Sequence, residues 1–181
     1  MRRPLLLAAI AAFALALLSC SKDATKSGGV PVEKEKPKVG VIPKGASHLF
    51  WLTVHAGAIK AGREFGLDIE WNAPATEIDV SRQIEIVDSM FNKNLAGIVL
   101  APVDRKALVA PVERAMKAGI PVAIYDSALD TDQQITYVAT DNKEVGRMAA
   151  RRLAEVIGKK GKVAVIGFMA GSASTMERED G

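Results

Sequence analysis

The sequence predicts an α/β protein: a doubly wound parallel sheet, followed by the beginning of a second, similar lobe. Three observations support this prediction. Short runs rich in Val and Ile alternate with amphipathic stretches from residue 38 onward. Most of these runs are nearly continuous in apolar residues, which is typical of strands that are covered on both faces. The connections between them are long enough for the right-handed crossover helices that join parallel strands.

The first strand is predicted at 38–43, where "KVGVIP" is apolar and rich in β-branched residues. A helix follows at about 47–65, because apolar residues recur at helical spacing and Gly66 supplies a stop signal. The second strand is predicted at 67–74, "LDIEWNAP". These three elements form the first strand–helix–strand unit.

The third strand is predicted at 96–102 and the fourth at 121–127, where "AGIVLAP" and "PVAIYDS" are short and apolar. The helix before the third strand can be capped by Asp79 or Ser81 and continues to about Asn92. The two strands therefore extend the same parallel sheet.

A helical stretch is predicted at 104–118, and Gly119 ends it. Pro111 lies inside this stretch and marks a turn or a restart of the helix, since proline has no backbone N–H. After a polar loop, "ITYVATDN" at 135–142 is predicted as the fifth strand.

A long amphipathic helix comes next and ends at "GKKG". Its apolar stripe comprises Val145, Met148, Ala149, Leu153 and Val156. The segment "KVAVIGF" at 162–168 is predicted as a further buried strand that starts a second sheet. We therefore expect the chain to Gly181 to be the first part of a two-lobed protein; one complete six-stranded domain is the alternative.

The N-terminal 19 residues are predicted to be a lipoprotein signal peptide. Arg2 and Arg3 precede the apolar run 4–18, which is shorter than the about 20 residues of a membrane span. The run ends in "LLSC", which resembles the bacterial lipobox, so Cys20 is the expected lipidation site. An ordinary secretory signal and an uncleaved anchor are the alternatives.

Residues 20–37 are predicted to form a flexible tether, because "SKDATKSGGVPVEKEKP" has no apolar periodicity. Cys20 is the only cysteine, which excludes an intrachain disulfide. The chain carries 24 Lys and Arg against 21 Asp and Glu, and two of the basic residues belong to the signal peptide. This balance gives no electrostatic footprint for nucleic acid.

Polar and aromatic residues follow the predicted strands, where parallel sheets bind their ligands. The candidate ligand-binding residues are Lys44, His48, Phe50, Trp51, Asp126, Ser127, Asp141 and Arg178. Carboxylate and guanidinium groups form charge-assisted hydrogen bonds with hydroxyls, and aromatic faces cover the C–H side of a sugar ring. The set therefore suits a sugar.

Each candidate has a structural alternative. Trp51 continues an apolar helical stripe and can belong to the core, whereas Phe50 lies off that stripe. His48 and Asp141 can simply cap the helices that follow them, and Arg178 can be an ordinary exposed residue.

Catalysis has less support. The sequence contains no GxGxxG, no GxxxxGK[ST], no GxSxG and no cysteine–histidine metal spacing. We therefore expect a protein without cofactor or metal that is not an enzyme. A flavodoxin-like enzyme would need a cofactor site that the sequence does not display.

Four segments together resemble the type 1 periplasmic sugar-binding proteins of ABC importers, of the ribose- and galactose-binding kind. They are "VGVIPKGASHLFWLTVHAGAIKAGREFGLDI", "IVDSMFNKNLAGIVLAPVDRKALVAPVERAMKAGIPVAIYDS", "YVATDNKEVGRMAA" and "STMEREDG". The resemblance implies two doubly wound lobes, joined by a hinge, that close on a monosaccharide and pass it to a membrane permease. The first lobe would be 38–140, and 141–181 would begin the second. The protein would be a monomer, anchored by lipid in the cell envelope, in the periplasm or on the outer surface.

The resemblance also implies roles for individual residues. The aromatic pair of the family matches Phe50 and Trp51, which would stack on the sugar ring. His48 matches a polar contact, Asp126 matches the aspartate that ends the fourth strand, and Arg178 matches the arginine of an RxxG motif.

Two departures leave the choice of sugar open. Ser127 stands where ribose-binding proteins often have arginine, and His48 stands where they often have asparagine. A ligand-sensing lipoprotein of the same fold, signalling to a chemoreceptor or histidine kinase, is the alternative function. A transcription regulator of this fold is disfavoured by the lipobox and by the lack of a helix-turn-helix before Lys38.

Overall fold

The structure is a computed structural model that describes residues 35–181. Lys36–Gly181 form one compact unit. The predicted signal peptide, the lipidation site at Cys20 and nearly all of the predicted tether lie outside the described residues. Within 35–181, no helix has both the length and the apolar character needed to cross a membrane.

The unit is built on one parallel sheet of five strands in the order β2-β1-β3-β4-β5. The strands are β1 (Lys38–Ile42), β2 (Asp68–Trp71), β3 (Gly97–Leu100), β4 (Val122–Tyr125) and β5 (Thr136–Val138). The predicted doubly wound parallel sheet is thereby confirmed. The chain reverses its direction of travel across the sheet between β1 and β3, and this reversal marks the usual ligand position in such sheets.

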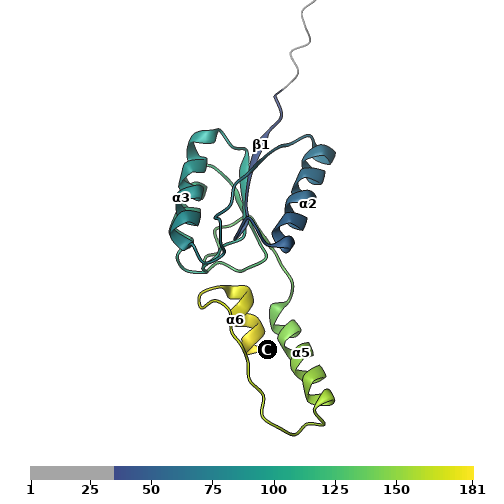
Figure 1. The fold of residues 1–181 in the computed structure, drawn as a ribbon. Helices are drawn as coiled ribbons and strands as arrows, with labels where there is room; N and C mark the ends of the chain where they lie inside the picture. Colours follow the sequence, from purple (N-terminus) through teal and green to yellow (C-terminus); the bar gives the residue numbers. More distant parts are fainter. Residues whose placement is uncertain (1–34) are drawn as a thin grey trace, which may run out of the picture. The chain divides into compact units, whose positions relative to one another are not determined.

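Helices cover both faces of the sheet. Figure 1 shows α2 (Leu49–Phe65) on one side of β1 and α3 (Val80–Met90) on the other. The short helix η1 (Phe91–Lys93) continues α3, and α4 (Val109–Lys117) packs beside α3. Two sequence signals act as predicted: Gly66 ends α2 at a φ of 67°, and the Asp79 carboxylate accepts from the Arg82 N–H to cap α3.

The core lies between the sheet and the helices α3 and α4. Its buried apolar residues are Ile42, Ile86, Val87, Met90, Ile98, Leu100, Val103, Leu108, Val112, Ala115, Val122, Ile124 and Leu129. Gln83 is fully buried among them and satisfies its amide with three backbone groups. It donates to the carbonyls of Pro43 and Ala101 and accepts from the Val103 N–H. This side chain ties together the carboxyl ends of β1 and β3, where the site lies.

The helical stretch predicted at 104–118 is shorter than expected. Asp104 begins a turn, in which its carboxylate accepts from the N–H groups of Lys106 and Ala107. The helix itself starts at Val109, so Pro111 falls in the first turn, where backbone N–H groups need no partner within the helix. The proline thus marks a helix restart, as one of the two predicted readings had it.

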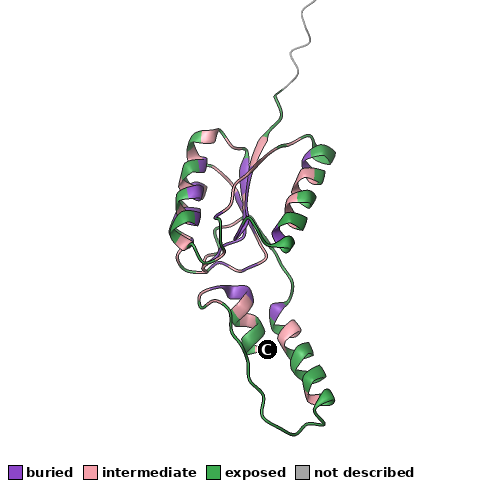
Figure 2. Cartoon of the chain, in the orientation of Figure 1, coloured by how far each residue is buried: buried purple, intermediate pink, exposed green. Residues whose placement is uncertain are grey.

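After β5, α5 (Asn142–Val156) and α6 (Ala173–Asp180) pack against each other. The buried strand predicted at 162–168 is wrong. This segment is exposed in Figure 2, with Ile166 at 96% and Phe168 at 69% exposure, and it forms no strand. An apolar run becomes a strand only beside another strand that accepts its backbone hydrogen bonds, and none pairs with it within residues 35–181. Neither a second sheet nor a six-stranded sheet is therefore present in the described part.

Candidate functional site

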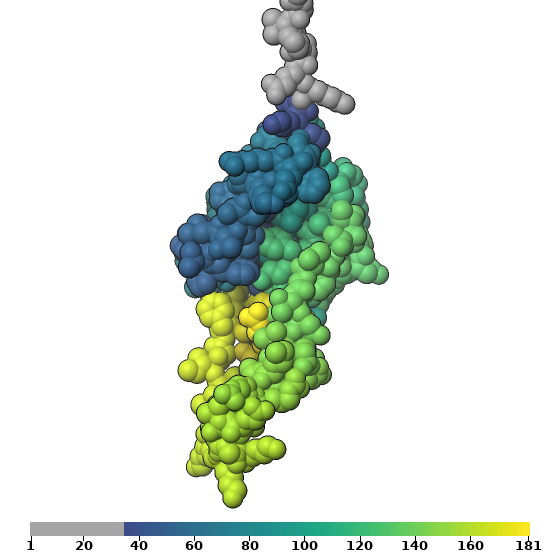
Figure 3. All heavy atoms as spheres, turned by 90° about the vertical axis from the view of Figure 1, so that its right-hand side faces the viewer, coloured from purple at the N-terminus to yellow at the C-terminus, as the bar shows by residue number. Residues whose placement is uncertain are grey.

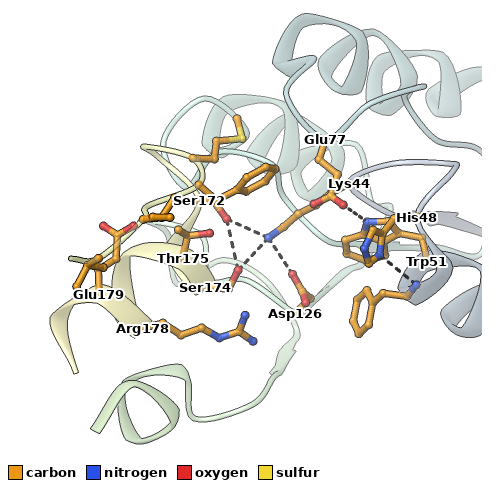
Figure 4. Close-up of a pocket in the computed structure, with 15 residues that line it drawn as sticks. Lys44, His48, Trp51, Glu77, Asp126, Ser172, Ser174, Thr175, Arg178 and Glu179 are labelled. Carbon is orange, nitrogen blue, oxygen red and sulfur yellow. Dashed lines mark hydrogen bonds and ion pairs between the residues drawn. The ribbon is translucent and has the colours of Figure 1, made fainter. Parts of the chain in front are cut away.

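A pocket of about 630 Å³ opens at the carboxyl ends of β1 and β4. Its lining comes from four stretches of the chain: the start of α2 with the residues before it, Glu77 in the loop between β2 and α3, the residue that follows β4, and residues 165–179. Six of the eight predicted ligand-binding residues line it (Figure 4). They are Lys44, His48, Phe50, Trp51, Asp126 and Arg178.

His48 is both the N-cap of α2 and part of the pocket wall. Its Nδ1 accepts a hydrogen bond from the Phe50 N–H at 3.2 Å. A neutral imidazole that accepts through Nδ1 carries its proton on Nε2, so the ring keeps one donor for the pocket. The capping role that sequence analysis offered as an alternative is observed, and it leaves the other nitrogen available.

The adjacent aromatic residues at the start of α2 take different positions. Neighbours on a helix point about 100° apart, and here the two rings meet edge to face with centroids 4.8 Å apart. Trp51 is only 2% exposed, and its Nε1 donates to a Glu77 carboxylate oxygen at 2.8 Å. Phe50 remains 48% exposed. Trp51 thus forms a buried floor, and Phe50 offers a free ring at the rim.

Asp126 is placed by an unusual backbone. Its φ is 65°, and the Ser127 N–H donates to the Tyr125 carbonyl at 2.7 Å, two residues back. This combination is typical of the rare γ-turn with positive φ at its central residue. Positive φ is strained for an aspartate, and such strain occurs most often at functional sites. The turn ends β4 and directs the carboxylate into the pocket.

Lys44 is buried in spite of its charge, at 4% exposure. Its Nζ lies 2.8 Å from Asp126 Oδ2 and 3.1 Å from the hydroxyls of both Ser172 and Ser174. Figure 4 shows these contacts converging on the ammonium group. The Ser127 hydroxyl is a fourth acceptor. This cage compensates the desolvation of the charge.

Two predicted ligand-binding residues lie outside the pocket lining. Ser127 is fully buried behind it, where its hydroxyl accepts from Lys44 and donates to Asp126. Asp141 is exposed and caps α5 through the Glu144 N–H at 2.9 Å. For Asp141 the structure realises the helix-cap alternative, because a carboxylate at this position satisfies a free N–H of the first turn.

Tyr125 lies beneath the site. Its ring meets Trp51 edge to face at 6.3 Å, and its buried hydroxyl finds no hydrogen-bond partner within residues 35–181. Burial raises the pKa of this phenol well above its usual value, and the neighbouring Asp126 charge raises it further. The phenol therefore stays neutral throughout the physiological range.

Residues 39–181 match the family model of the periplasmic binding protein domain. The chain belongs to this family. This match, together with the sugar-binding relatives described next, confirms the resemblance to type 1 periplasmic sugar-binding proteins of ABC importers.

Relatives of this periplasmic binding protein include the D-allose-binding periplasmic protein of Escherichia coli K12, 32% identical over 78% of this chain and 48% of its own length. The D-ribose/D-allose-binding protein of Pseudomonas aeruginosa is 28% identical over 93% of this chain and 55% of its own. A carbohydrate transporter solute-binding protein from Agrobacterium radiobacter, solved with D-arabinose, superposes with a TM-score of 0.78 at 32% identity, covering 81% of this chain and 51% of its own. The chain spans about half the length of the curated relatives it matches.

Sequence analysis missed several pocket residues of this periplasmic binding protein. Ser172 and Ser174 of the segment "AGSAS" line the pocket and are not among the predicted ligand-binding residues. Small hydroxyl residues at the N-cap and in the first turn of a helix could have indicated a polar contact. Glu77, which accepts the hydrogen bond from the Trp51 indole, lies in a loop whose sequence shows no motif that would have indicated a site. Within residues 35–181, no group of His, Cys, Asp and Glu could hold a metal ion.

Proposed function

We propose that this periplasmic binding protein captures a neutral monosaccharide or similar polyol and delivers it to an ABC transporter permease without changing it chemically. One observation carries the proposal. The Oδ2 atom of Asp126 contacts the Lys44 ammonium and the Ser127 hydroxyl, whereas Oδ1 has no hydrogen-bond partner within residues 35–181. A free carboxylate oxygen beside two aromatic rings suits a molecule with hydroxyls on its edge and C–H groups on its face.

The charges of the pocket favour a neutral ligand. Lys44 is balanced by Asp126 at 2.8 Å. Arg178 is the remaining cation of the lining, and Glu77 and Glu179 belong to the same lining. An anionic ligand would therefore meet no excess of positive charge. The sugars in the names of the relatives, D-allose, D-ribose and D-arabinose, are all neutral.

We further propose that residues 38–140 form the first lobe and that 141–181 begin the second. The sheet ends with β5 at Val138, and α5 begins at Asn142, which supports a lobe boundary between them. The proposal keeps Cys20 as the site of a lipid anchor in the cell envelope and keeps the protein monomeric.

A calorimetric titration tests the binding role. The protein expressed from its complete gene is titrated with D-allose, D-ribose, D-arabinose and D-galactose, and with D-glucuronate as an anionic control. We expect saturable heat with at least one neutral sugar and its loss in Asp126→Asn. Asp132→Asn, an exposed aspartate outside the pocket, serves as the matched control. Binding of the anion alone, or equal loss in both variants, would contradict the proposal.

A further inference from the structure

We infer that Lys44 is a positioning residue of the site: it joins Asp126 to the start of α6 and does not itself contact the ligand. The inference deepens the proposed function and rests on it in one respect, the assignment of Asp126 to the ligand. It replaces the expectation that Lys44 contacts the ligand directly with a different proposal.

The hydrogen-bond donors of the Lys44 ammonium are all occupied by protein acceptors. A lysine ammonium has three N–H donors and no acceptor. Four acceptors already surround the Lys44 ammonium: one Asp126 oxygen and the hydroxyls of Ser127, Ser172 and Ser174. All three protons are therefore used, and the side chain exposes only 6% of its surface. A ligand could gain a bond from this group only by breaking an existing one.

The N-terminal cap of α6 also involves Lys44. Ser172 is the N-cap residue of α6, and a serine at this position usually accepts a hydrogen bond from the first turn of the helix. Its side chain makes no such capping bond and instead meets Lys44 at 3.1 Å. The lysine contact thus takes the place of the ordinary cap.

Further bonds show that the segment before α6 is held against the sheet edge around this lysine. The Ser174 N–H donates to the Ser127 hydroxyl at 3.2 Å, and the Arg105 N–H donates to the Gly171 carbonyl at 2.9 Å. In Figure 3, yellow residues from the C-terminal end of the chain lie against blue residues near the start of α2. Lys44 is the charged centre of this contact, since its ammonium reaches acceptors on both segments.

The first experiment needs no ligand. Hydrogen exchange measured by mass spectrometry on the protein from its complete gene compares α6 amides in wild type, Lys44→Met and Lys60→Met. Lys60 is the control, because it forms an ion pair on the exposed face of α2. We expect exchange of 173–180 to quicken about tenfold or more in Lys44→Met only. Unchanged exchange there would overturn the inference, whether or not any sugar binds.

A second variant covers the case in which Lys44→Met does not fold. The double substitution Ser172→Ala with Ser174→Ala removes two acceptors and leaves the ion pair with Asp126 in place. The same acceleration of α6 exchange is expected. Exchange equal to wild type would contradict the role of Lys44 as a link.

The third experiment separates positioning from direct contact. Affinities for the bound sugar and its monodeoxy analogues are measured for wild type, for Lys44→Met, for Asp126→Asn, and for the variant that combines Lys44→Met with Asp126→Asn. If Lys44 acts through Asp126, Lys44→Met weakens every analogue by a similar factor, about thirtyfold or more, and weakens binding no further in Asp126→Asn. If one deoxy analogue binds wild type and Lys44→Met equally, that hydroxyl contacts the ammonium and the inference fails. Equal weakening in both backgrounds would also refute it.

Discussion

Phe50→Ala should weaken sugar binding while leaving the fold almost intact, because the Phe50 ring is the half-exposed member of the aromatic pair. The ring is 48% exposed and lines the pocket, whereas its neighbour Trp51 is 2% exposed. Only the exposed ring has free surface that a ligand can cover.

The expected magnitude follows from that exposure. A phenylalanine side chain has about 200 Å² of surface, so 48% exposure leaves about 100 Å² free. If a sugar face covers half of this area, burial at about 25 cal/mol per Å² contributes about 1.2 kcal/mol. The alanine variant should therefore bind about tenfold more weakly. Loss of the edge-to-face contact with Trp51 should lower the free energy of unfolding by about 1 kcal/mol.

Calorimetry gives the affinity, and urea denaturation gives the free energy of unfolding. Phe65→Ala is a matched control, since Phe65 belongs to the same helix, is 74% exposed and lies outside the pocket lining. We expect wild-type affinity for this control. If Phe50→Ala also binds like wild type, the ring makes no contact with the ligand and the stacking assignment is refuted.

Three further predictions test the structure around the site. Trp51→Phe removes the buried indole N–H bond, so the free energy of unfolding in urea should fall by about 1–3 kcal/mol; no change would exclude that bond. Gly57→Ala adds a methyl group with no atom within 4 Å and should raise the free energy of unfolding by about 0.5–1 kcal/mol. Gly171→Ala, at a φ of 95° and against the Asp104 carboxylate, should lower the free energy of unfolding by about 1 kcal/mol or more. Urea denaturation measures both values, and the reverse order would contradict the geometry. Tyr125 and Tyr137 both have a pKa raised above 10.0, chiefly by burial, so their contribution to stability is complete below pH 10 and is lost as the pH rises further. The midpoint of phenolate absorbance in the native protein should therefore lie above pH 10, and a midpoint at the ordinary tyrosine value would refute the burial.

Most of the sheet could be predicted because its signals are local. Strands β1, β3 and β4 are short runs dominated by apolar residues, and Gly66 and Asp79 act as helix stop and cap in the structure. The run 162–168 carried the same signal and forms no strand. Its apolar side chains resemble those of a buried strand, but a strand also needs a hydrogen-bonding neighbour, which composition does not reveal.

The candidate site was predicted in part. Lys44 and Asp126 were chosen because each follows a strand, and both line one pocket in the structure, since parallel strands end at a common edge. The same rule offered Asp141, whose carboxylate is used by a helix N-terminus instead. Ser172 was missed because its importance comes from a lysine 128 residues earlier in the chain.

The sequence by itself determined the α/β class, the order of strands and helices, and which residues stand at the carboxyl ends of the strands. These properties follow from burial and backbone hydrogen bonding within short segments, which leave a periodic record in the chain. Only the tertiary structure decided that Trp51 is buried under the pocket and that Phe50 lies at its rim. It also decided that Asp126 adopts a positive φ. The hydroxyls that enclose the Lys44 ammonium come from serines that follow it by 83, 128 and 130 positions in the chain. Such contacts depend on how distant loops meet once the sheet has formed, and no local pattern specifies that meeting.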